Sequence, residues 1–174
     1  MKKESKFKWI ITVLLLSFTL SILMSLGSNM IIPKINLYLG IIIILVFILI
    51  SIFFDMVGVA ITAAEERPFH SMASKKVKGS SHSVRLLKNS DKLASICNDV
   101  IGDVCGVVSG SAGVLVANTL ADILNKDVSL VVLITTAVIA SLTITGKALG
   151  KSIAIKNSEK ITFRVGKVVS IFKK

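Results

Sequence analysis

Residues 37–63, LYLGIIIILVFILISIFFDMVGVAITA, form an apolar run that carries a single charged residue, Asp55. A helix that crosses a hydrocarbon layer about 30 Å thick needs about 20 predominantly apolar residues. The run is longer than that, so it predicts a transmembrane helix. The whole chain agrees with this interpretation, because 53% of its 174 residues are hydrophobic and its mean hydropathy is +0.81, which is more apolar than the core of a soluble domain requires.

Three further apolar windows precede or follow this run in the sequence, at Trp9–Leu26, 93–124 and Val128–Ala148. The window at 93–124 is diluted by Gly, Ser, Asn and Asp, which suits a helix in the interior of a bundle. The sequence therefore predicts an all-α integral membrane protein with four transmembrane helices. We expect an N-terminal unit, 1–36, with a basic head and one helix, followed by a unit at 37–174.

The net charge of +11 would suggest nucleic acid as the partner of a soluble protein. Here Lys and Arg gather before the first span, at 67–92 and from residue 147 onward, whereas the other two connections carry only Lys34 and Lys126. This alternation follows the positive-inside rule and predicts a multi-pass protein of the cell (inner or plasma) membrane with both termini in the cytoplasm. The expected partner of the basic faces is the bilayer with its anionic headgroups, not nucleic acid.

The first span has a second interpretation. A basic start, an apolar stretch and small residues near Gly27 are also typical of a cleaved signal peptide. The later spans are the same under either interpretation.

The connections carry recognisable turn residues. We expect an outer turn at 28–36 that includes Pro33, and a tight turn at 125–127. The cytoplasmic segment, 64–92, should form short helices that are broken at Pro68 and Gly79. A juxtamembrane helix is expected at 152–174, where apolar and basic residues partly segregate.

No phosphate-binding glycine loop, nucleophile elbow or histidine-based triad is present, so the sequence does not predict an enzyme or a covalent cofactor. Cys97 and Cys105 are separated by about 12 Å if helical, which is too far for a disulfide, so we expect free thiols. Gly102, Gly106 and Gly110 recur every four residues and predict a helix-packing strip, within one chain or across a dimer.

The acidic residues of the spans are the candidate functional site. An ionised aspartate at mid-membrane costs about 2.5 to 3.5 kcal/mol on insertion scales, so it needs a partner, a proton, a metal or water. At about 1.5 Å of rise per residue, Asp99, Asp103 and Asp55 lie about 6, 12 and 10 Å from the cytoplasmic ends of their helices. With Asn98 they could bind a hard cation such as Mg²⁺ in one layer. Alternatively, Lys147 from the last span forms an ion pair that neutralises the acidic charge and stabilises the helix bundle.

Three stretches carry a resemblance to a known family: FFDMVGVAITAAEERPFHSMA (53–73), RLLKNSDKLAS (85–95) and GKALGKSIAIKNSEKITFRVGKVVSIF (146–172). This order resembles the membrane domain of the CorB/CorC and cyclin M divalent-cation transporters, from about Leu37 to the C-terminus. The last stretch is similar to the family segment Gly-Glu-x-x-Pro-Lys-Ser-x-Ala-x-x-Asn-x-Glu-Lys-Ile. The resemblance implies a homodimer of three-helix protomers that bind Mg²⁺ within the membrane through Ser, Asn and Glu side chains and backbone carbonyls.

The chain departs from the family at informative positions. Lys147 stands where the family has Glu, Gly150 stands where it has Pro, and the nucleotide-binding CBS pair has no counterpart in these residues. A fixed ammonium repels a divalent cation unless extra carboxylates compensate. Three functions remain open. The first is binding or transport of Mg²⁺ or a related divalent cation, with Lys147 as a modulator of the ion site, and the second is a non-transporting dimeric scaffold or partner subunit in which Lys147 neutralises the aspartates. The third is a small membrane-anchored regulator that acts through the basic segment 64–92.

Overall fold

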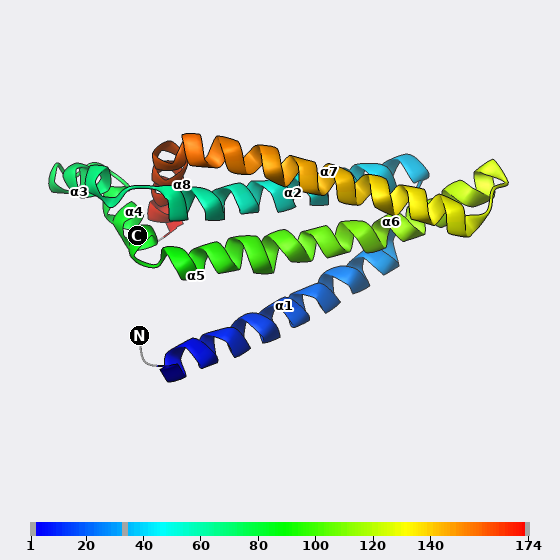
Figure 1. Ribbon diagram of the computed structural model, residues 1–174, viewed down its shortest axis with the longest axis horizontal. Coiled ribbons are helices and arrows are strands. Elements are labelled where there is room, and N and C mark those ends of the chain that lie inside the picture. Colours follow the sequence, from blue (N-terminus) through cyan, green and yellow to red (C-terminus); the bar gives the residue numbers. More distant parts are fainter. Residues whose placement is uncertain (1–2, 33–34, 173–174) are drawn as a thin grey trace.

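The structure is a computed structural model that describes residues 3–32 and 35–172. Figure 1 shows long helices side by side, with the N-terminal helix diverging from them and shorter helices gathered at one end. Every regular element in these ranges is a helix. In chain order they are α1 (Lys3–Ile31), α2 (Leu37–Ala63), α3 (Glu66–Ser74), α4 (Ser80–Lys88), α5 (Ser90–Ser95), the π-helix η2 (Ile96–Gly102), α6 (Asp103–Leu124), α7 (Val128–Lys156) and α8 (Ser158–Phe172).

Four stretches of helix are long and apolar enough to cross a membrane: Phe7–Ile31, Leu37–Ala63, Ser90–Leu124 and Val128–Lys156. The predicted all-α membrane fold with four spans is therefore confirmed. Helices are the expected solution here, because each backbone N–H and C=O in the hydrocarbon layer must find its partner within the segment. The third span is continuous through α5, η2 and α6, and over half of its most apolar window is buried inside the protein, as its diluted composition predicts.

The core is the bundle of α2, α6 and α7, each of which contacts the other two. Two apolar clusters fill it. One lies around Ile48 and Val116, and the other joins α6 to α7 near the tight turn. Helix α1 packs along α6 and η2, but no residue of its most apolar window is buried, so the three-helix bundle is complete without most of it.

The tight turn at 125–127 forms as predicted. Asn125 adopts a left-handed conformation with φ 49°, and the Asp127 carboxylate accepts hydrogen bonds from the backbone N–H groups of Ser129 (2.6 Å) and Leu130 (3.2 Å) at the start of α7. Helix α7 runs to Lys156, beyond the predicted boundary at 148, because its Ala, Lys and Ile residues favour a helix that continues until Asn157. The predicted outer-turn residues Pro33 and Lys34 and the end of the C-terminal helix at 173–174 lie outside the described residues.

The end of the bundle that holds α3, α4 and α8 is called the basic end here. The predicted break at Gly79 is confirmed, since its φ of +94° is a left-handed conformation that suits glycine. The predicted break at Pro68 is wrong. Pro68 lies in the first turn of α3, where its missing N–H has no intrahelical partner to lose, and the chain breaks at the extended residues Ala64 and Glu65 instead.

Two close contacts fix α8 across this end. The Thr162 hydroxyl donates a hydrogen bond to the Ala60 carbonyl of α2 at 3.2 Å, and Thr162 is fully buried. At Gly166, α8 crosses α4 so closely that a Cβ would lie 2.9 Å from the Ser83 backbone nitrogen and 3.1 Å from the Gly79 carbonyl oxygen. The absence of a side chain at Gly166 is therefore what lets the two helices touch.

Candidate functional site

One face of α2 carries the polar residues that point into the bundle. Ser51, Asp55 and Gly58 are spaced four and three residues apart, so they share that face. Ser51 is fully buried, Asp55 is 4% exposed and Gly58 is buried, all within a helix that is otherwise apolar. Asp55 is thus held at the interior of the bundle, as the sequence predicted.

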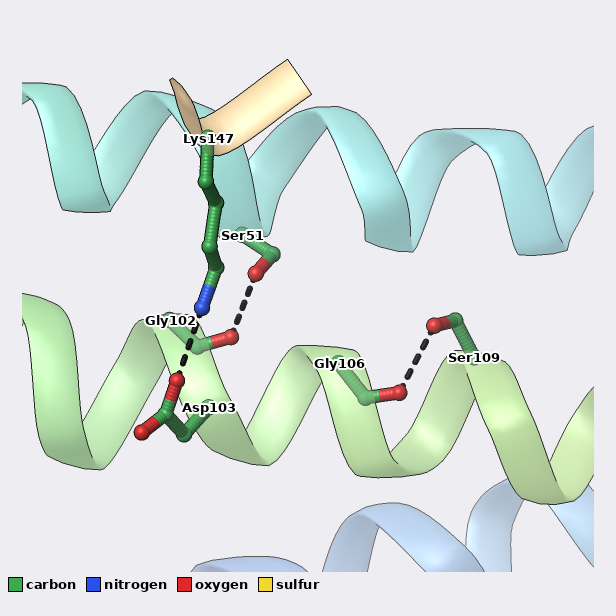
Figure 2. A network of polar contacts seen from close by, with 6 residues as sticks. All are labelled: Ser51, Gly102, Asp103, Gly106, Ser109 and Lys147. Carbon is green, nitrogen blue, oxygen red and sulfur yellow. Dashed lines mark hydrogen bonds and ion pairs between the residues drawn. The ribbon is translucent and has the colours of Figure 1, made fainter. Parts of the chain in front are cut away.

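The π-helix η2 lies against this face. The Ser51 hydroxyl donates a hydrogen bond to the Gly102 carbonyl at 2.5 Å, which ties α2 to the last residue of η2 (Figure 2). About two turns further along α2, the Asn98 side chain packs on Gly58, where a Cβ would lie 2.8 Å from the Asn98 Cγ. Gly58 therefore makes room for the Asn98 amide at the same interface that buries Asp55.

The π-helical geometry of 96–102 was not predicted from the sequence, and it holds both Asn98 and Asp99. A π-turn closes hydrogen bonds between residues five apart, so it changes the angular position of side chains relative to a regular α-helix, and such turns occur frequently at functional sites. An α-helical extrapolation places Asp99 and Asp103 on one inward face. In the structure, Asn98 instead faces α2, whereas Asp99 is exposed on the outside of the bundle.

Two buried oxygen atoms at this interface have no hydrogen-bond partner among the described residues: Asp55 Oδ2 and Asn98 Oδ1. Burial of a polar group without a partner costs about 1–3 kcal/mol, and more for a charged group. Both atoms are acceptors, so the group that would satisfy them is a proton donor or a cation. The α2–η2 interface is consequently a small, acidic site built from oxygen atoms.

The remaining predicted residues lie apart from that interface. Asp103 is on α6 with 63% of its side chain exposed, and its carboxylate pairs with the Lys147 ammonium of α7 at 2.7 Å (Figure 2). Asp99 forms no side-chain hydrogen bond or ion pair with any described residue. Within residues 3–32 and 35–172, no group of three or more His, Cys, Asp and Glu side chains is placed to hold a metal. The structure buries Asp55 on the face of α2 whose Gly58 contacts Asn98, but it does not bring the three aspartates together.

Lys147 lies in the half of α7 nearer the basic end, and its side chain reaches into the bundle, as expected for a residue of the last span. Only 19% of its side chain is exposed, and its ammonium lies 3.9 Å from where a Cβ on Gly102 would be. Its position follows from Gly146 and Gly150, because added Cβ atoms there would collide with the side chains of Ile52 and Met56. This second glycine strip brings α7 close to α2, and the Gly150 that replaces the family's Pro is part of it.

The three packing glycines have different surroundings. A Cβ on Gly102 would lie 3.1 Å from the Cys97 carbonyl oxygen of its own π-helix and 3.5 Å, an ordinary contact, from the Ser51 carbonyl oxygen of α2. A Cβ on Gly106 would make ordinary contact with the Ser51 hydroxyl at 3.9 Å, and one on Gly110 would meet nothing within 4 Å. No Cβ on these glycines would come closer to another helix than ordinary contact, so a packing role for the strip, within the chain or across a dimer, stays a prediction. Both cysteines are free thiols, with Cys105 buried and Cys97 half-buried.

Ser51 and Gly58 were missed by the sequence reasoning, although a signal for both exists. Each lies within one helical turn of Asp55 on the same face of an apolar helix, at the i−4 and i+3 positions. A search for residues that share the face of a membrane-embedded carboxylate would have found them.

The comparisons with known proteins gave one match. The profile of the cyclin M transmembrane N-terminal domain family matches residues 41–174, from the second turn of α2 through α8, and excludes α1. No curated protein and no solved structure matches the chain significantly.

Proposed function

This chain belongs to the cyclin M transmembrane domain family, and on that premise we propose that it binds Mg²⁺ or a related hard divalent cation as cargo at the α2–η2 interface. The family is one of membrane divalent-cation transporters. The observation that carries the proposal is the pair of buried, unpartnered oxygen atoms, Asp55 Oδ2 and Asn98 Oδ1. A cation would satisfy both of these acceptors at once.

The donor set suits a hard cation. Asp55 offers a carboxylate, Asn98 an amide oxygen and Ser51 a hydroxyl whose lone pairs remain available while its proton is donated to Gly102. Oxygen ligands of this kind favour Mg²⁺ and Ca²⁺, whereas softer metals prefer the sulfur or nitrogen of Cys and His. Cys97 is the one cysteine on η2, and no histidine lies in the spans.

Lys147 is proposed to tune this site through Asp103. The ammonium would repel a divalent cation if its charge were uncompensated. Its 2.7 Å ion pair with Asp103 supplies that compensation and holds the ammonium on the α6 side of η2. In this proposal Asp103 belongs to the modulator and not to the ligand set, and Asp99 is an additional negative charge near the same level.

The Lys147–Asp103 pair also favours a second candidate function. In a dimeric scaffold or partner subunit without transport, a lysine that neutralises an aspartate of a span would simply stabilise the helix bundle. This alternative does not account for Asp55, which forms no ion pair with any described cation. The cation-binding function is therefore the better supported of the two.

The test is thermal unfolding of the detergent-purified protein with and without MgCl₂. A ligand that binds only the folded state stabilises it by about 2.7 kcal/mol at 100 times its Kd. Asp55→Asn should abolish this protection while leaving the metal-free protein as stable as before or more stable, because the substitution removes an unpartnered buried carboxylate. Asp103→Asn removes no proposed ligand but leaves the Lys147 ammonium uncompensated, so it should retain Mg²⁺ protection with a weaker affinity.

Uptake of Mg²⁺ into proteoliposomes then separates binding from transport. Transport should be lost in Asp55→Asn and retained, with altered affinity, in Asp103→Asn. If Mg²⁺ neither stabilises nor crosses the membrane, and both substitutions change only the metal-free stability, the scaffold function replaces the cation proposal.

A further inference from the structure

A cavity lies at the basic end, on a different part of α2 from the cation site. It has a volume of about 470 Å³, which is within the range of small-molecule sites of about 300–1,000 Å³. It is lined by side chains of three helices: Phe53, Met56 and Val57 of α2, Ile153 of α7, and Lys160, Ile161 and Arg164 of α8, together with Asn157 between the last two helices.

The polar side of the cavity is formed by one face of α8 together with Asn157, the residue before it. Asn157, Lys160 and Arg164 recur at three- and four-residue spacing, so the amide and the two cations project together. Neither Lys160 nor Arg164 forms an ion pair with any described residue, and Glu159 is the only acidic residue after Asp127. This leaves two positive charges side by side without an acidic partner from the protein.

The opposite side of the cavity is apolar and faces away from the bundle interior. Phe53 and Ile153 are more than half exposed, and both belong to stretches apolar enough to lie in the hydrocarbon layer. At 3.6 residues per turn, Phe53, Met56 and Val57 fall on the side of α2 opposite to Ser51, Asp55 and Gly58. The cavity and the cation site are therefore separate.

We propose that this cavity binds the headgroup of an anionic phospholipid, with the phosphate on Lys160 and Arg164 and the first part of the acyl chains along Phe53, Met56 and Ile153. Arg pairs with phosphate through two parallel N–H groups, Lys adds a point charge, and the Asn157 amide can donate to a phosphate or glycerol oxygen. A soluble phosphate would use the two cations but would leave the exposed apolar wall uncovered. The membrane supplies a ligand that uses both halves of the cavity.

The experiment titrates phosphatidylglycerol into the detergent-purified full chain and counts bound lipid by native mass spectrometry. The pocket variant is Lys160→Gln/Arg164→Gln, and the matched control is Lys151→Gln/Lys167→Gln, which removes the same charge from exposed residues of α7 and α8 that do not line the cavity. Each basic residue at an anionic surface contributes a several-fold gain, so the pocket variant should bind the tightest lipid about 25-fold more weakly. The control should bind it like the unmodified protein.

Two further arms decide the source of the phosphate. Phosphatidylcholine should not compete, and glycerol phosphate should not bind at the concentrations where phosphatidylglycerol saturates. Equal weakening in both double variants would mean diffuse attraction to the basic end and would overturn the proposal. Binding of glycerol phosphate as tight as that of the lipid would also overturn it, in favour of a soluble anion.

Discussion

At the residue scale, Asp55 and Asp103 are the same residue type in opposite surroundings. Asp55 is 4% exposed with one unpartnered oxygen, whereas the side chain of Asp103 is 63% exposed and is paired with Lys147 at 2.7 Å. A buried charge without a partner is costly and is retained where it has a use, whereas a paired charge needs no further explanation. This difference is what assigns the cation site to Asp55 and the modulating role to the Lys147–Asp103 pair.

The ion pair gives the first residue-scale prediction. Lys147→Met leaves the Asp103 carboxylate without its cation, so it should destabilise the protein more than Asp103→Asn/Lys147→Met together. Residues in direct contact show interaction energies of about 0.5–3 kcal/mol, and we expect about 1–2 kcal/mol here. A double-mutant cycle of the unfolding free energy in detergent measures it. A coupling near zero would show that the pair adds nothing to stability.

Gly58 gives the second residue-scale prediction. A Cβ at Gly58 collides with the Asn98 amide, so Gly58→Ala should destabilise the protein by about 1–3 kcal/mol and displace a proposed ligand. Gly110→Ala meets open space and is the control, expected to be neutral or stabilising by up to about 1 kcal/mol, since alanine costs less backbone entropy than glycine. The measurements are thermal unfolding and Mg²⁺ protection. Equal effects of the two substitutions would contradict the Asn98–Gly58 contact.

At the element scale, apolar run length was enough to predict four spanning helices, and turn chemistry predicted the break at Gly79 and the turn at Asn125. The candidate site was only partly predictable. The burial of Asp55 follows from its place in a nearly unbroken apolar run, but the position of Asn98 depends on the π-turn at 96–102, which leaves no pattern in residue type or spacing. A change in hydrogen-bond register within a helix rotates every side chain before it, so the outward position of Asp99 could not be deduced from the spacing of Asp99 and Asp103.

The docking of α8 is testable at the same scale. Gly166→Ala places a methyl group against the backbone of α4, so the two helices must separate. We expect faster hydrogen exchange in α4 and α8 and little change in α6 or α7, because short elements open with lower free energy than the bundle. Val168→Ala, at a half-exposed position of α8, is the control. Exchange that rises equally in the long helices would mean that α8 is not a separate unit.

At the scale of the whole molecule, the charge distribution divides the bundle into two unlike ends. The segments at 67–92 and from 147 onward carry fifteen of the 21 Lys and Arg residues, six of them in α3, α4 and α8 at the basic end, whereas the turn at 125–127 carries only Lys126. Basic segments remain in the cytoplasm during insertion, so the basic end is expected to face the cytoplasm and the turn to face outward.

Cysteine labelling in intact cells measures this orientation. In a Cys97→Ala/Cys105→Ala background, Lys126→Cys should react with a membrane-impermeant maleimide added outside. Lys78→Cys should react only after permeabilisation. Both positions are exposed, so accessibility within the protein is matched. The reverse pattern would invert the assigned orientation.

The hydrogen bond from Thr162 to Ala60 joins a side chain of α8 to the main chain of α2. Its acceptor is a main-chain carbonyl, so the only side-chain group that this hydrogen bond uses is the hydroxyl of Thr162. Substitutions on the exposed, lipid-facing side of α2 therefore leave the attachment of the surface helix in place.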